Sequence, residues 1–299
     1  MSAPSPVDPA QLRRMPLPEP RDGGGKEERG RVLVVGGSRE LPGAVLLAGT
    51  AALRAGAGKL QIGAPASLGI PLGLAVPEAL VAGLAETEAG SVAAEAADRV
   101  VELGGRCRAV LLGPGLAVDD DTEALVRRVL TGLDGPAIVL DAAAMMRIAD
   151  APGALARQPG RVVITPHAGE MAGILGISKD EIEADPIGTA RRAARQLGVV
   201  VVLKGACSFI ARPDGEAWSC RHGNVGLATS GSGDTLAGIM TGLLGRGAEP
   251  LQAALWAVYL HGEAGIRLAR RVGPLGYLAR ELPAEVPAVL AELAPDSGG

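Results

Sequence analysis

Short apolar runs alternate with segments of helical spacing along most of the chain. The apolar runs predict buried strands over residues 31–35, 59–63, 109–112, 137–140, 162–164 and 199–203. The helical spacing predicts helices over residues 44–55, 91–103, 122–130 and about 187–197, and the proline-bearing segment before residue 91 is expected to be a loop. Strands that alternate with helices indicate an α/β fold with a doubly wound, mainly parallel sheet.

The pattern changes after residue 203. Ser208–Ala211 and Ala217–Cys220 flank the turn sequence Pro-Asp-Gly-Glu, which predicts a β-hairpin. Helices are then expected over residues 234–244, 251–270 and 277–293. Residues 1–25 are rich in Pro, Arg, Glu and Gly, so we expect a flexible tail that lies on the surface or is disordered. Residues 26–295 contain no recognisable linker and are predicted to form a single domain.

Composition narrows the class of protein. Of the 299 residues 47% are hydrophobic and only 2% aromatic, so the core must consist mainly of Val, Leu, Ile and Ala. A net charge of −4 without a basic block argues against a nucleic-acid partner. The three cysteines fit neither a disulfide framework nor a C-x-x-C metal site, which favours reduced thiols and a cytoplasmic location.

No targeting or membrane segment is predicted either. The N-terminus lacks the apolar core of a signal peptide. The uncharged segment 60–77 contains Pro65, Pro71 and Pro77, which exclude a membrane-spanning helix. We therefore expect neither a membrane nor a nucleic acid among the partners.

Glycine accompanies a polar or charged residue in the loop after almost every predicted strand. In such sheets the carboxyl ends of the strands lie at one edge, where ligands bind. Glycine is common in these turns, which explains any one loop but not the whole series. We therefore predict an active site built from these loops: Gly36-Gly37-Ser38, Gly113-Pro114-Gly115, Asp141, Pro166-His167-Ala168-Gly169-Glu170, Lys204-Gly205 and Ser230-Gly231-Ser232-Gly233-Asp234.

The stretch Gly223–Leu236 carries the strongest chemical signal. Its glycines end at Asp234, and the apolar spacing that follows predicts a helix. Free backbone N–H groups and the positive end of the helix dipole make such a position an anion site. A carboxylate there suits proton transfer beside a phosphate. The chain has neither G-x-x-x-x-G-K-[ST] nor G-x-G-x-x-G, so a glycine loop of another type is expected to bind the phosphate.

An ordered series of motifs resembles the ADP/ATP-dependent NAD(P)H-hydrate dehydratases of the ribokinase-like superfamily. The resemblance covers about residues 26–295 and implies a three-layer αβα sandwich with the hairpin near the nucleotide site. No counterpart is expected of the epimerase domain found in fused members. The motifs are V-L-V-V-G-G-S (32–38), P-G-A (42–44), A-A-L-R-A-G-A-G (51–58), L-G-P-G-L (112–116), T-P-H-A-G-E (165–170), V-V-L-K-G (201–205), A-T-S-G-S-G-D-T-L-A-G (228–238) and Y-L-H-G (259–262).

The resemblance implies a role for individual residues. Asp234 would be the catalytic base and would also contact the substrate, and Glu170 would hold Mg²⁺ through water. Ala44, Gly115 and His167 would bind NAD(P)H hydrate. The nucleotide, ADP or ATP, would lie against Lys204, Gly205, Ala206, Cys207, Ser208 and Gly233, and the anion hole would be Gly231, Ser232 and Gly233.

The residues alone also allow purely structural roles for these side chains. Asp234 and Glu170 could be ordinary helix caps, and His167 an ordinary loop histidine. The glycines around Ser232 could form a plain tight turn. His261 and Arg54 are interpreted as structural.

The sequence also departs from the family pattern. Lys26 is preceded by Gly25 instead of the usual His, and Ala168 and Ser230 replace a Pro and a Gly. Ala143 replaces the second Asp of D-A-D-A-L, which puts some substrate contacts in question.

Two alternative functions stay open. The first is a small-molecule kinase of the same fold that acts on a vitamin-precursor alcohol. The second is a nucleotide-binding regulator without catalysis. The resemblance favours ADP over ATP and implies a homo-oligomer, a tetramer in the family.

Overall fold

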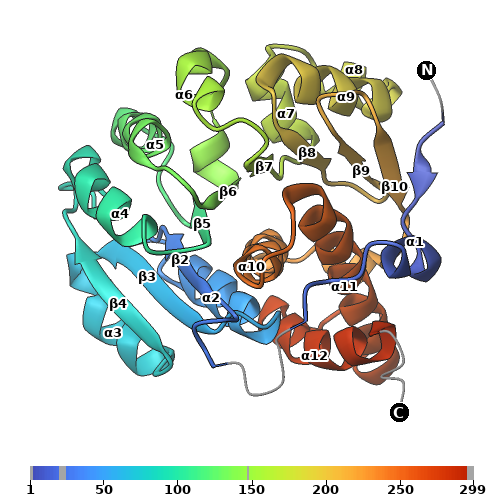
Figure 1. The fold of residues 1–299 in the computed structure, drawn as a ribbon, viewed down its shortest axis with the longest axis horizontal. Helices are drawn as coiled ribbons and strands as arrows, with labels where there is room; N and C mark the ends of the chain where they lie inside the picture. The colour runs from blue at the N-terminus through green and yellow to red at the C-terminus, as the bar shows by residue number, and fades with distance from the viewer. Residues whose placement is uncertain (1–2, 20–24, 147, 295–299) are drawn as a thin grey trace.

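The computed structural model describes residues 3–19, 25–146 and 148–294. Its centre is a ten-stranded sheet with the order β1-β10-β9-β8-β7-β6-β5-β2-β3-β4 (Figure 1). Neighbouring strands from β4 to β8 are parallel, whereas β8, β9 and β10 pair antiparallel. The strands are β1 Ser5–Pro6, β2 Arg31–Val35, β3 Lys59–Pro65, β4 Ala79–Leu84, β5 Ala109–Leu112, β6 Ala137–Leu140, β7 Val162–Ile164, β8 Val200–Leu203, β9 Ser208–Ala211 and β10 Ala217–Cys220.

Helices cover both faces of the sheet. Side chains alternate across a strand, so Val32 and Val34 pack in one core and Leu33 and Val35 in the other. The first core contains α2 Gly43–Arg54, α10 Ser232–Gly245, α11 Pro250–Arg271 and α12 Leu282–Leu293. The second core contains α4 Ala97–Gly104, α5 Asp120–Gly132, α6 Pro152–Ala156, α7 Ala168–Leu175, α8 Lys179–Ala184 and α9 Pro186–Leu197. The predicted three-layer αβα sandwich and the hairpin β9–β10 are confirmed.

Helices α2 and α10 approach each other through glycine. A Cβ atom on Gly238 would lie 2.2 Å from the carbonyl oxygen of Ala48, and one on Gly242 would lie 2.3 Å from that of Ala52. Only glycine permits this separation. The close packing holds the N-terminus of α2, with Ala44, and that of α10, with Asp234, at the same edge of the sheet.

The N-terminal segment corrects the expectation of a flexible tail. Strand β1 pairs parallel with β10, and α1 (Pro9–Arg13) buries Leu12 completely. The indole N–H of Trp256 donates to the carbonyl of Met15 at 2.8 Å. This segment therefore covers the edge of the sheet through backbone pairing and packing, which composition does not reveal. Residues 1–2 and 20–24 of the predicted tail, and residue 295 of the predicted domain, lie outside the described residues.

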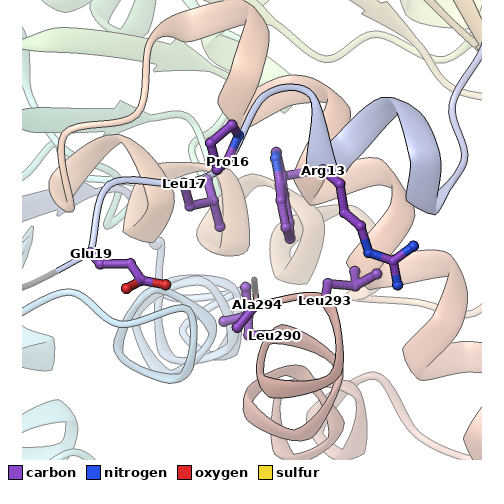
Figure 2. Close-up of a pocket in the computed structure, with 8 residues that line it drawn as sticks. Arg13, Pro16, Leu17, Glu19, Leu290, Leu293 and Ala294 are labelled. Carbon is purple, nitrogen blue, oxygen red and sulfur yellow. The ribbon is translucent and has the colours of Figure 1, made fainter. Parts of the chain in front are cut away.

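A small cavity lies beneath this segment. Its volume is about 100 Å³, and Figure 2 shows Pro16 and Leu17 on one side with Leu290 and Leu293 of α12 on the other. The side chains that line it are mostly apolar, so the cavity belongs to the packing between the N-terminal segment and α12.

Other elements differ from the predicted bounds. The segment predicted as a loop before residue 91 contains α3 (Gly69–Ala75) and the edge strand β4. Helix α12 begins at Leu282, five residues after the predicted start, and a short 3₁₀ helix, Ala279–Glu281, precedes it. The Tyr277 hydroxyl before it donates to Asn224 Oδ1 at 2.9 Å. Among the described residues, no helix combines the length and the apolar character needed to cross a membrane.

Candidate active site

Four charged side chains meet at the carboxyl ends of the central strands. Lys204, directly after β8, places its Nζ 3.1 Å from Asp141 Oδ1 and 3.8 Å from Glu170 Oε2. Asp141 follows β6, Glu170 lies in the first turn of α7, and Asp234 lies in the first turn of α10. Elements that are distant in the sequence thus form one charged cluster, as predicted for the loops of this edge.

Asp141 anchors Lys204. Its carboxylate is 4% exposed and accepts a hydrogen bond of 2.6 Å from the Thr165 hydroxyl. Burial alone would lower the pKa of Lys204, but attraction to Asp141, Glu170 and Asp234 outweighs it and raises this pKa. Lys204 therefore remains a cation at neutral pH, fixed in position at the edge of the sheet.

Asp234 has an unusual acidity. Burial raises its pKa to about 7 from an ordinary value of 3.8, and repulsion from Asp141 and Glu170 adds to the effect, whereas Lys204 opposes it. A carboxyl group with this pKa exists in both protonation states at neutral pH. It can therefore accept and release a proton under working conditions.

The start of α10 has the geometry of an anion site. Gly231, the N-cap residue, has φ +84°, and it makes no side-chain cap for the helix. The N–H of Ser232 donates to the carbonyl oxygen of Thr229 at 3.2 Å, so among the described residues of the first turn the N–H of Gly233 is the donor left to point out of the helix end. A Cβ atom on Gly233 would lie 3.4 Å from Lys204 Nζ, so the ammonium group lies directly beside this turn.

Ala44 and Gly115 lie next to each other. A Cβ atom on Gly115, which has φ +71°, would be 3.0 Å from the Cβ of Ala44. A Cβ atom on Gly113 would be 1.8 Å from the carbonyl oxygen of Asp141, so this loop lies against the residue that holds Lys204. Gly115 thus lies between the start of α2, which carries Ala44, and the loop that contacts Asp141.

A cavity of about 790 Å³ opens beside the anion site. This volume suits a ligand of nucleotide size. The predicted residues that line it are His167, Lys204, Gly205, Ala206, Ser208, Ser232 and Gly233. The predicted residues Ala44, Gly115, Glu170, Cys207, Gly231 and Asp234 are not among the described residues that line it.

Comparisons with known proteins agree with this geometry. Residues 32–288 match the protein family described as NAD(P)H-hydrate dehydratase. The chain belongs to this family. It is 50% identical over 289 residues to the ADP-dependent (S)-NAD(P)H-hydrate dehydratase of Xanthomonas campestris pv. campestris, with 96% of each chain covered. The sequence-based assignment to the family is therefore confirmed.

Two further relatives extend the comparison. The bifunctional NAD(P)H-hydrate repair enzyme of Moorella thermoacetica is 41% identical over 280 residues, which is 94% of this chain but only 53% of that protein. The structure of the ADP/ATP-dependent NAD(P)H-hydrate dehydratase from Bacillus subtilis, co-crystallised with ATP and Mg²⁺, has a TM-score of 0.84 at 33% identity. It covers 98% of this chain and 99% of its own.

His167 and Glu170 stabilise the start of α7 in this member of the dehydratase family. His167 caps α7, since its Nδ1 accepts from the backbone N–H of Glu170 at 3.1 Å. Glu170 Oε2 in turn accepts from the backbone N–H of His167 at 2.7 Å. The helix-cap interpretation of Glu170 is confirmed, whereas His167, interpreted as a loop histidine, is the N-cap of α7. The same bonds hold the imidazole at the cavity wall and the carboxylate beside Lys204.

Several site residues were not singled out from the sequence as binding residues. Asp141 bonds Lys204 and Thr165 bonds Asp141; the sequence placed Asp141 in the site loops and Thr165 in the T-P-H-A-G-E motif but gave neither a role. His222, Asn224 and His261 line the cavity, so all three histidines of the chain lie around it. His261 was interpreted as structural although it lies in the motif Y-L-H-G.

Proposed function

We propose that this protein dehydrates (6S)-NAD(P)H hydrate with ADP as phosphoryl donor and so repairs the nicotinamide cofactor. The reaction would convert ADP and the hydrate into AMP, phosphate and NAD(P)H. Asp234 carries the proposal, since its carboxyl group has a pKa of about 7, belongs to the first turn of α10 and is close enough to Lys204 to feel its charge. Membership of the dehydratase family supports it.

The residues would divide the chemistry among them. Asp234 would accept the proton of the substrate's 6-hydroxyl group as that oxygen receives the phosphoryl group. Lys204 and the N–H group of Gly233 would stabilise the charge on the transferred oxygens. Ala44, Gly115 and His167 would hold the hydrate. Loss of the phosphate would then restore the dihydronicotinamide ring.

The cavity suggests an orientation for the nucleotide. Its polar end is the anion site, whereas Val225, Leu227 and Val258 line an apolar part. The ring of His222 is also part of the lining, stacked on Tyr259 with 4.3 Å between ring centroids. We infer that the phosphates lie at Gly233 and that the adenine packs against the apolar part and this aromatic pair.

Mg²⁺ is compatible with the same site. The described residues contain no group of three or more His, Cys, Asp or Glu side chains placed to hold a metal. Mg²⁺ is often bound by one or two carboxylates, water and nucleotide phosphates, and Glu170 offers a carboxylate beside Lys204 that fits this mode. When bound, the ion would neutralise phosphate charge.

The decisive experiment is incubation of the protein with NADH hydrate and either ADP or ATP. Recovery of the NADH absorbance with release of phosphate supports the proposal, and faster recovery with ADP would establish the predicted donor. A stable phosphorylated product would indicate the kinase instead, and nucleotide binding without turnover would indicate a regulator. The family comparison does not favour the kinase. The homo-oligomeric state, a tetramer in the family, and the cytoplasmic location stay predictions.

A further inference from the structure

His261 reaches from α11 to the start of α10. Its Nε2 atom lies 2.9 Å from the hydroxyl oxygen of Ser232 and 3.1 Å from the carbonyl oxygen of the same residue. Both residues line the cavity, and Ser232 is only 6% exposed. One imidazole nitrogen therefore contacts two oxygens of the residue between Gly231 and Gly233.

The carbonyl contact assigns the proton on the ring. A carbonyl oxygen can only accept a hydrogen bond, so the Nε2 atom of His261 must carry hydrogen. Burial lowers the pKa of His261 to about 4, and repulsion from Lys204 acts in the same direction. The imidazole is therefore neutral at pH 7, with its single N–H proton on Nε2.

It follows that the Ser232 hydroxyl does not donate its proton to His261. Because Nε2–H is the donor, the hydroxyl oxygen accepts in the same three-centre contact. Its own hydrogen remains available for an acceptor in the cavity. Ser232 is the first residue of α10, so this hydrogen is placed beside the backbone N–H of Gly233 at the helix end.

We propose that His261 is a positioning residue that orients the Ser232 hydroxyl toward a phosphoryl group of the bound nucleotide. The inference rests on the proposed function, since it requires a nucleotide in the cavity. His261 acts through Ser232 and does not touch the reacting atoms. A donor that is oriented in advance needs no reorganisation when charge develops on the phosphoryl oxygens.

A double-mutant cycle tests this role through the affinity for ADP, measured by calorimetry. His261→Leu removes the N–H donor, and we expect about a 10-fold loss of affinity, typical of a hydrogen bond to a charged group. His261→Gln places an amide N–H near the position of Nε2 and should regain most of this loss. Ser232→Ala should lose a similar factor, and the double variant should lose no more than Ser232→Ala alone.

Thr241→Val is the matched control. Thr241 is a buried residue of α10 whose hydroxyl donates within the helix to the carbonyl oxygen of Ala237 at 2.7 Å, so its loss should leave ADP affinity unchanged. Melting temperatures of all variants identify any that fail to fold. Additive losses in the double variant, or a folded His261→Gln no better than His261→Leu, would overturn the inference. Wild-type protein that does not bind ADP would instead refute the proposed function.

Discussion

Asp234→Asn should stabilise the protein while it removes turnover. The folded state holds this carboxyl at a pKa of about 7, against 3.8 for the ordinary group. Because the folded pKa is raised, the folded state binds the proton more tightly than the unfolded state, and ionisation destabilises the fold as pH rises from about 4 to 7. An amide cannot ionise, so the variant avoids this loss.

The size of the effect follows from the pKa. One pKa unit corresponds to about 1.4 kcal/mol, so the ceiling is about 4 kcal/mol above pH 7. Partial exposure of Asp234 and the loss of its attraction to Lys204 reduce the gain to about 2 kcal/mol. At roughly 2 °C per kcal/mol in a chain of this size, the melting temperature should rise by about 4 °C.

The assay is thermal unfolding of both proteins from pH 5 to pH 8.5, together with recovery of NADH from its hydrate. We expect the difference in melting temperature to grow with pH and to level off above pH 7, and turnover to fall by at least about 1,000-fold. The control is Asp134→Asn, since this carboxylate is 97% exposed and lies at the opposite edge of the sheet, before β6. A difference that is independent of pH, or near-normal turnover, would refute the reasoning.

Four further outcomes are expected. Lys204→Met should lower the free energy of unfolding by about 3 kcal/mol, because it leaves the buried carboxylate of Asp141 unpaired, and calorimetry should show weaker ADP binding. Gly238→Ala should lower stability by about 3 kcal/mol in urea unfolding, because the new methyl group would collide with the Ala48 carbonyl and force α10 away from α2. Leu12→Ala should cost about 3 kcal/mol in the same measurement while turnover is kept, because Leu12 is fully buried in the N-terminal segment, away from the site. ADP should raise the melting temperature of the wild-type protein by mass action, and an unchanged value at saturating ADP would contradict a nucleotide site.

The sequence by itself determined most strands of the sheet, its mainly parallel character and the edge that carries the site. The apolar runs, the turn before Ala217 and the glycine loop that ends at Asp234 are local signals, because strand burial, turn type and helix start depend on neighbouring residues. The ordered motifs then identified the family without any knowledge of distances between residues in the fold. The same local reasoning did not reveal β4 and α3, whose segment contains prolines and glycines, or the docking of β1, which depends on a partner strand more than 200 residues away.

Only the tertiary structure decided the chemistry of individual side chains. The pKa of Asp234 depends on burial and on the charges of Asp141 and Lys204, which follow strands β6 and β8. The hydrogen bond between His261 and Ser232 joins two helices, and no local sequence pattern predicts it. Such properties arise from distances between elements that are remote in the chain, and those distances are set by packing, as where Gly238 and Gly242 bring α10 against α2.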